Sequence, residues 1–175
     1  HQNQGGEGVE ILEWMLQTKR TIDTPLLTDF PEGSTPKEIG KRLGRLFAKG
    51  KHNGKTLSYP ETFTWNGALK YAEVAKDNEL IQPLKDGFES FFTTDKSFLP
   101  GMDHVDRNMF GSLPLTLYLI TKDERYREMG MPYADTQWEV PENASASAKS
   151  WAAKGYSWQT RLWIDDMYMI TIVQT

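Results

Sequence analysis

The sequence predicts an all-α fold built of stacked helical hairpins. Two observations lead to this prediction. Apolar residues recur at the three- and four-residue spacing of helices between start and stop signals, and one helix–turn–helix pattern repeats after 46 residues. Alternation of apolar and polar residues, which is typical of half-buried strands, is nowhere long enough to predict a sheet.

The sequence pattern in the N-terminal third of the chain predicts two helices. The first covers 10–19, where four apolar residues lie at helical spacing. The second follows a cap at Thr35, with Pro36 at its first position and Glu38 three residues after the cap. We expect it to end at Gly50, because glycine is the common residue just past a helix C-terminus.

A Gly- and Lys-rich loop is expected over 50–58, and two further helices follow it. The first should begin near Thr64 and run to Asp77 through a series of alanines and apolar residues. The second should cover 79–92, with Pro83 in its first turn or at a kink.

The hairpin pattern occurs twice. Residues 76–80, Lys-Asp-Asn-Glu-Leu, recur at 122–126 as Lys-Asp-Glu-Arg-Tyr, and each copy follows an apolar helix that carries a tyrosine. Before the second copy, Ser112 is expected to cap a helix and Pro114 to lie in its first turn. The repeated unit is a helix, a Lys-Asp turn and a second helix. A solenoid and a closed ring of hairpins both satisfy this repeat.

The composition limits the function. The chain has 175 residues, a mass of 20.1 kDa and a formal net charge of −4, which we interpret as one domain over residues 1–175. Lys and Arg form no block longer than two residues, and no apolar run is long enough for a membrane span. We therefore expect no nucleic-acid or membrane partner. The absence of cysteine and the three scattered histidines predict no metal site.

The loops before the first helix of each hairpin hold the candidate functional residues. If hairpins stack in register, these loops lie at one level and form a common mouth. The residues that would line it are Trp65, Asp103, His104, Asp106, Tyr156, Trp158, Trp163 and Asp165. An indole can stack on the C–H face of a sugar while a nearby acid supplies a proton. The alternative is a core tryptophan beside a helix-capping aspartate.

Two segments resemble the unsaturated uronyl hydrolases, glycoside hydrolase families 88 and 105. Residues 159–169 follow a motif of Gln, then Trp-aliphatic-Asp, then aliphatic-Tyr-Met. The second segment starts at Asp106 with Gly five residues later, and a Leu-rich helix follows. Its matching positions are Leu115, Leu117, Tyr118, Thr121, Asp123 and Tyr126. The resemblance covers roughly 60–175.

The resemblance implies an (α/α)6 barrel and a hydrolase that removes an unsaturated uronic acid from the non-reducing end of oligosaccharides. Rhamnogalacturonan or related polysaccharides cut by lyases would be the source. Water adds across the C4–C5 double bond of the sugar without metal or cofactor. By resemblance, Asp165 is the general acid/base and Asp106 the second essential carboxylate. Trp163 would bind substrate by stacking, with Trp65, His104 and Trp158 as further contacts.

Several alternatives stay open. Asp166 follows Asp165, so the catalytic assignment could shift by one residue, and Asp103 and His104 compete with Asp106. Six hairpins need roughly twice this length. We therefore expect the N-terminal portion of a barrel, partnered by the remaining half or by a second copy. A periplasmic or secreted location is expected, with a cytoplasmic one as the alternative. A glycan-binding or protein-interaction module without catalysis is the alternative function.

Overall fold

The computed structural model describes residues 29–50 and 55–175, and these residues are helical without a strand. Contacts divide the chain after Ile39, and the unit from Gly40 onward holds all of the helices given below except the first four residues of α2. The α-helices are α2 (Pro36–Lys49), α3 (Tyr59–Ala75), α4 (Asn78–Glu89), α5 (Val105–Asn108), α6 (Ser112–Thr121), α7 (Glu124–Thr136), α8 (Ala146–Ala153) and α9 (Ile164–Gln174). The short 3₁₀ helices are η2 (Ser90–Phe92), η3 (Lys96–Phe98) and η4 (Met109–Gly111). The all-α prediction is confirmed.

Some sequence predictions fall outside these residues or need correction. The helix expected over 10–19 lies outside the described residues. The helix expected from Thr64 begins five residues earlier, because Ser58 and Glu61 form a capping box before it. Ser112 is the first residue of α6 rather than its cap, and the preceding Gly111 has no side chain to donate or accept. Of the described helices, none is long and apolar enough to cross a membrane.

The two copies of the repeat form the hairpins α3–α4 and α6–α7. Lys76 and Lys122 end the first helix of each hairpin in the left-handed conformation, with φ of 54° and 60°. Asp77 and Asp123 then cap the second helix by accepting a backbone N–H from its first turn. The Lys-Asp turns are therefore structural, as the repeat predicted.

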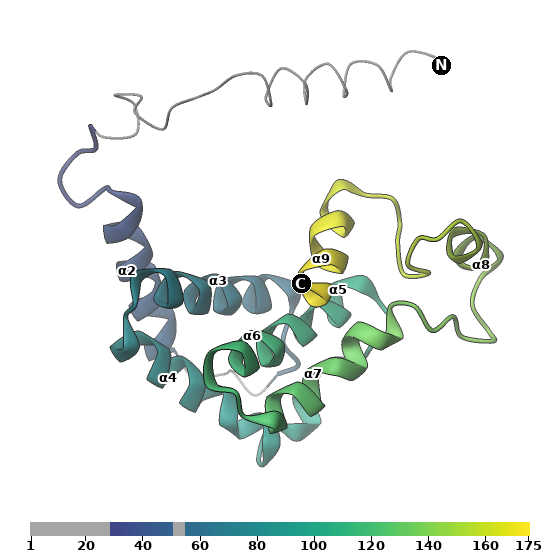
Figure 1. The fold of residues 1–175 in the computed structure, drawn as a ribbon, viewed down its shortest axis with the longest axis horizontal. Coiled ribbons are helices and arrows are strands. Elements are labelled where there is room, and N and C mark those ends of the chain that lie inside the picture. Colours follow the sequence, from purple (N-terminus) through teal and green to yellow (C-terminus); the bar gives the residue numbers. More distant parts are fainter. Residues whose placement is uncertain (1–28, 51–54) are drawn as a thin grey trace. The chain divides into compact units, whose positions relative to one another are not determined.

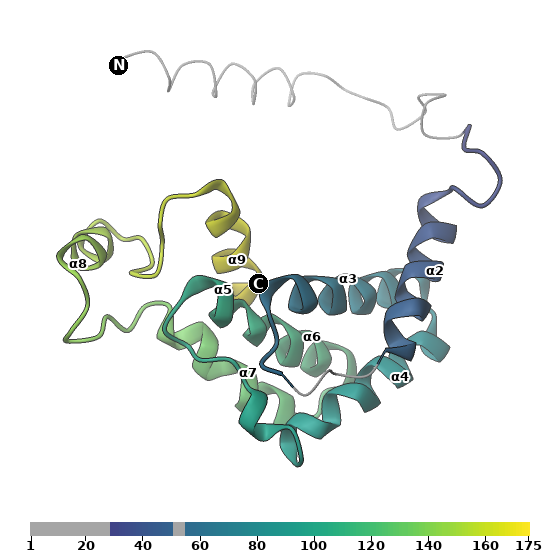
Figure 2. The same ribbon diagram turned by 180° about the vertical axis from the view of Figure 1, so that it is seen from behind.

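The first helices of the hairpins pack side by side. α6 contacts α3 and α9, while α4 packs on α3 and α7 packs on α6. In both ribbon views α6 lies between α3 and α7 (Figures 1 and 2). The buried amide of Asn66 in α3 donates to Ser112 Oγ at 3.3 Å and accepts from Thr116 Oγ1 at 3.1 Å. Asn66 and Ser112 are 46 positions apart, which is the period of the sequence repeat. Equivalent positions of the two hairpins therefore lie next to each other in the packed structure.

Aromatic side chains fill the space between the hairpins. Phe88 of α4 stacks on Phe110 of η4 with ring centres 5.8 Å apart, and the ring of Tyr133 of α7 contacts Phe110 with centres 5.2 Å apart. The backbone approaches closely here, since a Cβ added at Gly111 would lie 2.4 Å from Tyr133 Cβ. Glycine at this position therefore allows α7 to pack against the start of α6.

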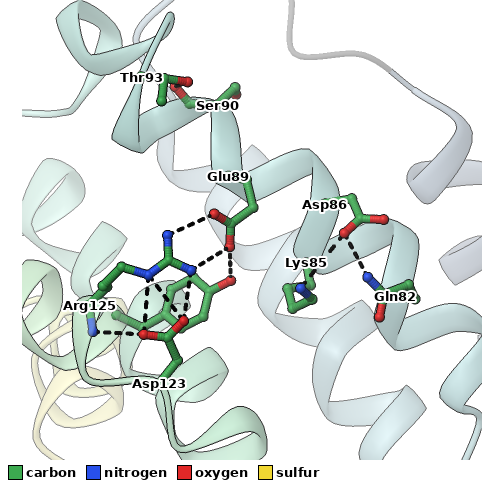
Figure 3. Close-up of polar contacts among 9 residues, drawn as sticks. Gln82, Lys85, Asp86, Glu89, Ser90, Thr93, Asp123 and Arg125 are labelled. Atoms are coloured by element: carbon green, nitrogen blue, oxygen red, sulfur yellow. Dashed lines mark hydrogen bonds and ion pairs between the residues drawn. The ribbon is translucent and has the colours of Figure 1, made fainter.

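A charged cluster ties α4 to α7 (Figure 3). Arg125 donates to Glu89 at 3.2 Å and to Asp123 at 2.7 Å, and its guanidinium lies 5.0 Å from the centre of the Phe92 ring. Tyr126 donates its hydroxyl to Glu89. Burial, followed by the hydrogen bond to Glu89, raises the pKa of Tyr126 well above its ordinary value. The hydrogen bond from Arg125 lowers the pKa of Asp123. These contacts join the second helices of the two hairpins, α4 and α7.

Candidate active site

The candidate site lies where the N-terminal ends of α5 and α9 meet. These two helices contact each other, and α9 also packs on η4 and α6. The chain reaches α9 through the turn 157–163, which is fastened by three hydrogen bonds. Ser157 and Trp158 donate to the backbone carbonyls of Gln137 and Thr136 at the end of α7. Gln159 donates to the carbonyl of Met102 just before α5. The turn is therefore fixed to both neighbouring elements.

Arg161 is the centre of the site. Its Nη2 lies 3.0 Å from Asp106 Oδ1, 2.6 Å from Asp166 Oδ1 and 3.6 Å from Asp165 Oδ2. One guanidinium therefore gathers three carboxylates from two elements. Sequence reasoning missed Arg161. Arg161 lies in the turn before α9, outside the helix, where no periodic spacing indicates which side chains meet.

Asp166 is a structural carboxylate. Its side chain is 1% exposed and accepts hydrogen bonds from the backbone N–H groups of Arg161 at 2.6 Å and Trp163 at 3.2 Å. The Nε of Arg161 donates to it at 3.0 Å. Burial raises the pKa of Asp166, but the hydrogen bonds from Arg161 and Trp163 together outweigh it and hold the pKa below its ordinary value. Asp166 thus stays ionised and closes the first turn of α9.

The side chain of Asp165 is far more exposed to solvent than that of the adjacent Asp166. Its side chain is 48% exposed, and its carboxylate accepts no hydrogen bond from the described residues. Between the two adjacent aspartates, Asp165 is the one that a ligand can reach. The backbone turn just before it contains Leu162 at a φ of 59°, a conformation that costs a non-glycine residue on the order of 1–2 kcal/mol. The turn directs the N–H groups on either side of Leu162 toward Asp166.

His104 and Asp106 lie on the opposite side of the cluster. His104 precedes α5, and its Nδ1 accepts the backbone N–H of Asp106 at 3.2 Å. That nitrogen also lies 3.7 Å from Asp106 Oδ2. Both contacts of Nδ1 are therefore with Asp106, one with its backbone and one with its carboxylate. His104 therefore holds the helix start and the Asp106 backbone in place.

Trp163 presents an aromatic surface beside these groups. It is 59% exposed, and the Arg161 guanidinium carbon lies 4.3 Å from the ring centre. Nearby, Phe63 of α3 contacts Tyr168 of α9 with ring centres 5.3 Å apart. Tyr168 follows Asp165 by three residues and so lies on the same side of α9. The sequence reasoning did not single out this pair of partly exposed rings.

Two of the four residues predicted to contact substrate lie elsewhere. Trp65 is 6% exposed and packs among Phe47, Phe88 and Phe91, beside a cavity of about 560 Å³ between α2, α3 and α4. Since α3 begins at Tyr59, Trp65 lies inside the helix and not in a loop at the mouth. Trp158 is half-buried against the end of α7, where its indole N–H donates to a carbonyl. The structure brings neither residue to the carboxylates.

The structure thus brings His104, Asp106, Trp163 and Asp165 together around Arg161, and their catalytic and binding roles stay predictions. Within the described residues, no group of three or more metal-ligating side chains has a geometry suited to a metal ion. Paired carboxylates beside an exposed tryptophan, on an all-α hairpin fold, define a site of the helical glycosidase class.

The comparison with protein families gives the particular family. The sequence model of Glycosyl Hydrolase Family 88 matches residues 39–175, and the chain belongs to this family. Membership supports glycoside hydrolase activity on unsaturated uronides in general, and the helical hairpins fit part of its all-α six-hairpin fold. Similarity to family 105 stays a prediction. Searches of curated proteins and of solved structures found no significant match.

Proposed function

We propose that this chain contributes the acid/base site of a hydrolase that removes a 4,5-unsaturated uronic acid from the non-reducing end of oligosaccharides. Rhamnogalacturonan fragments and related lyase products are the proposed substrates. The observation that carries the proposal is the convergence of Asp165, Asp106 and Trp163 around Arg161. Membership of family 88 supports the general class of reaction.

Asp165 acts as the general acid/base in this proposal. Its carboxylic acid gives a proton to C4 of the double bond, and a water molecule adds to C5. The water returns a proton to Asp165, so the side chain ends the step as it began. The hemiketal formed at C5 opens, and the leaving sugar departs with its hydroxyl. The exposure of Asp165 supports this role, because Asp166 is buried and already saturated by donors.

Asp106 and Trp163 have supporting roles. Asp106 is the second carboxylate, held by Arg161 on one side and by the backbone contact of His104 on the other. It can orient the water that adds to C5. Trp163 offers the face on which the sugar ring stacks. His104 reaches substrate only through its Nε2, since its Nδ1 is occupied.

A protein partner is part of the proposal. Ile164, Met167 and Tyr168 of α9 expose apolar surface, and Phe63 of α3 extends it. Apolar patches of this kind mark surfaces that other protein covers. We propose that further helical hairpins or a second copy of the chain lie on this face and complete the mouth above Trp163. Light scattering that reports a stable 20.1 kDa monomer would count against this part.

Absorbance of the conjugated double bond provides the test. The assembled protein should remove the near-ultraviolet absorbance of unsaturated oligosaccharides and leave saturated ones unchanged. Asp165→Asn keeps the side-chain shape without a transferable proton, so the rate should fall by about 10²–10⁴. Asp103→Asn is the matched control, because Asp103 is also an exposed aspartate paired with an arginine four residues away.

Two outcomes would redirect the proposal. If Asp165→Asn and Asp103→Asn lose activity equally, the acid/base assignment is wrong. If the protein binds the oligosaccharide but never removes its absorbance, the glycan-binding alternative replaces catalysis. Asp166→Asn is unsuitable as an activity control, because it would disturb the buried contacts that hold the turn before α9.

A further inference from the structure

One nitrogen of Arg161 is left unused by the carboxylate cluster. Nε and Nη2 donate to Asp166, and Nη2 also donates to Asp106. Within the part of the chain that the structure describes, Nη1 makes no hydrogen bond, and it is not among the buried polar atoms that lack a partner. Nη1 therefore reaches solvent, and its two N–H groups are available to a ligand.

The surroundings of Nη1 suit a sugar that carries a carboxylate. The guanidinium carbon lies over the Trp163 ring, 4.3 Å from its centre, and the indole is still 59% exposed, so a cation adjoins an open aromatic surface. Guanidinium N–H groups form strong, directional hydrogen bonds with carboxylates, and an indole accepts the C–H face of a sugar ring. A neutral sugar could stack on the indole, but it has no carboxylate to pair with the guanidinium.

We propose that Arg161 is a specificity-determining residue that receives the carboxylate of the unsaturated uronic acid on Nη1. The inference rests on the proposed function for the identity of the substrate. It adds a binding role to a residue that otherwise serves to hold Asp106 and Asp166.

The same guanidinium would also set the distance between acid and substrate. The carboxylate carbon of the sugar is bonded to C5, and C5 is joined by the double bond to C4. Asp165 Oδ2 lies 3.6 Å from Nη2 of Arg161. A carboxylate bound at Nη1 would share one guanidinium with Asp165, and the proposal places C4 of the sugar next to that acid. A sugar bound with its carboxylate turned away would present other carbons to the acid.

The charges around Arg161 are compatible with an anionic ligand. The contacting groups are Asp106, Asp165 and Asp166, and His104 contacts Asp106. Asp166 is balanced by the guanidinium and by two backbone N–H groups. Asp106 accepts a hydrogen bond from Nη2 of the same guanidinium at 3.0 Å. The hydrogen bond to Asp166 raises the pKa of Arg161, which keeps the cation present at any working pH.

Binding measurements test the proposal without requiring turnover. A 4,5-unsaturated uronic acid disaccharide and its methyl ester are titrated by calorimetry into the assembled protein carrying Asp165→Asn, which should bind the ligands with little turnover. A hydrogen bond to a charged partner is worth about ten- to hundred-fold in affinity, so the free acid should bind tighter than the ester by about that factor. The side-chain ¹⁵N signals of Arg161 should shift with the acid and much less with the ester. Equal binding of acid and ester, or unchanged Arg161 signals, would overturn the proposal.

A variant locates the preference at Arg161. Arg161→Lys keeps a cation for Asp166, but its single nitrogen cannot also serve a ligand, so the preference for the acid should disappear. Arg107→Lys, at an exposed arginine paired with Asp103, should retain it. If Arg161→Lys fails to fold, the pair Arg161→Gln with Asp166→Asn replaces the buried ion pair by neutral amides and should also lose the preference. A full preference in either variant refutes the inference. If absorbance is lost but acid and ester bind alike, only this inference fails, whereas acid-selective binding without loss of absorbance contradicts only the proposed function.

Discussion

Asp166→Ala should destabilise the protein far more than the position of Asp166 in the first turn of a helix suggests. The substitution removes the acceptor of two backbone N–H groups and one member of a buried ion pair. Removing one partner of such a pair costs about 3–5 kcal/mol. Arg161 retains Asp106 and some access to solvent, so we expect the lower end, about 3 kcal/mol. At about 2–4 °C per kcal/mol, the melting temperature should fall by roughly 6–12 °C.

The stabilisation by Asp166 should also depend on pH. Its pKa in the folded protein is lowered from the ordinary value of 3.8. The folded state therefore binds this proton less readily than the unfolded chain. The contribution is complete above the ordinary pKa and disappears as the pH falls from 3.8 through the lowered value. Unfolding curves in urea between pH 7 and pH 2 should converge for the wild type and Asp166→Ala at the acidic end.

Asp165→Ala is the matched control for this experiment. It removes the same charge from the adjacent residue of the same helix turn, but the side chain is 48% exposed and its contact with Arg161 is 3.6 Å long. Such partly exposed pairs contribute about 0–1 kcal/mol. If Asp166→Ala costs no more than Asp165→Ala, or if the difference between them does not change with pH, the structural role of Asp166 is refuted.

Two further predictions concern the packing of the hairpins. Asn66→Ala should lower the free energy of unfolding by about 1–3 kcal/mol in urea, because it leaves the buried Ser112 hydroxyl without its amide partner, and an unchanged midpoint would contradict this bridge. Gly111→Ala should cost about 1–3 kcal/mol or more, since its Cβ would lie 2.4 Å from Tyr133 Cβ. Gly67→Ala, where nothing lies within 4 Å, should instead stabilise α3 by about 0.5–1 kcal/mol, and thermal unfolding that shows the same sign for both glycines would refute the packing argument.

The sequence alone determined the helical hairpins and their register. Helix periodicity, the proline and glycine punctuation and the Lys-Asp turns are local features, and local features decide where helices begin and end. The repeat of 46 residues also predicted which positions of neighbouring hairpins meet, and the contact of Asn66 with Ser112 has that separation. The predicted helix start at Thr64 was wrong, because the capping box at Ser58 begins the helix upstream of the alanine-rich run on which the prediction was based.

Only the tertiary structure decided which of several chemically similar residues a ligand can reach. Asp165 and Asp166 are indistinguishable by type, and only the turn before α9 buries one and exposes the other. Trp65 and Trp163 likewise differ by their neighbours, since one lies among core rings and the other beside Arg161. Access, charge pairing and distance depend on residues far apart in sequence, such as Asp106 and Arg161, 55 positions apart. Local sequence patterns do not predict such contacts, because the contacts form only when the helices pack against one another.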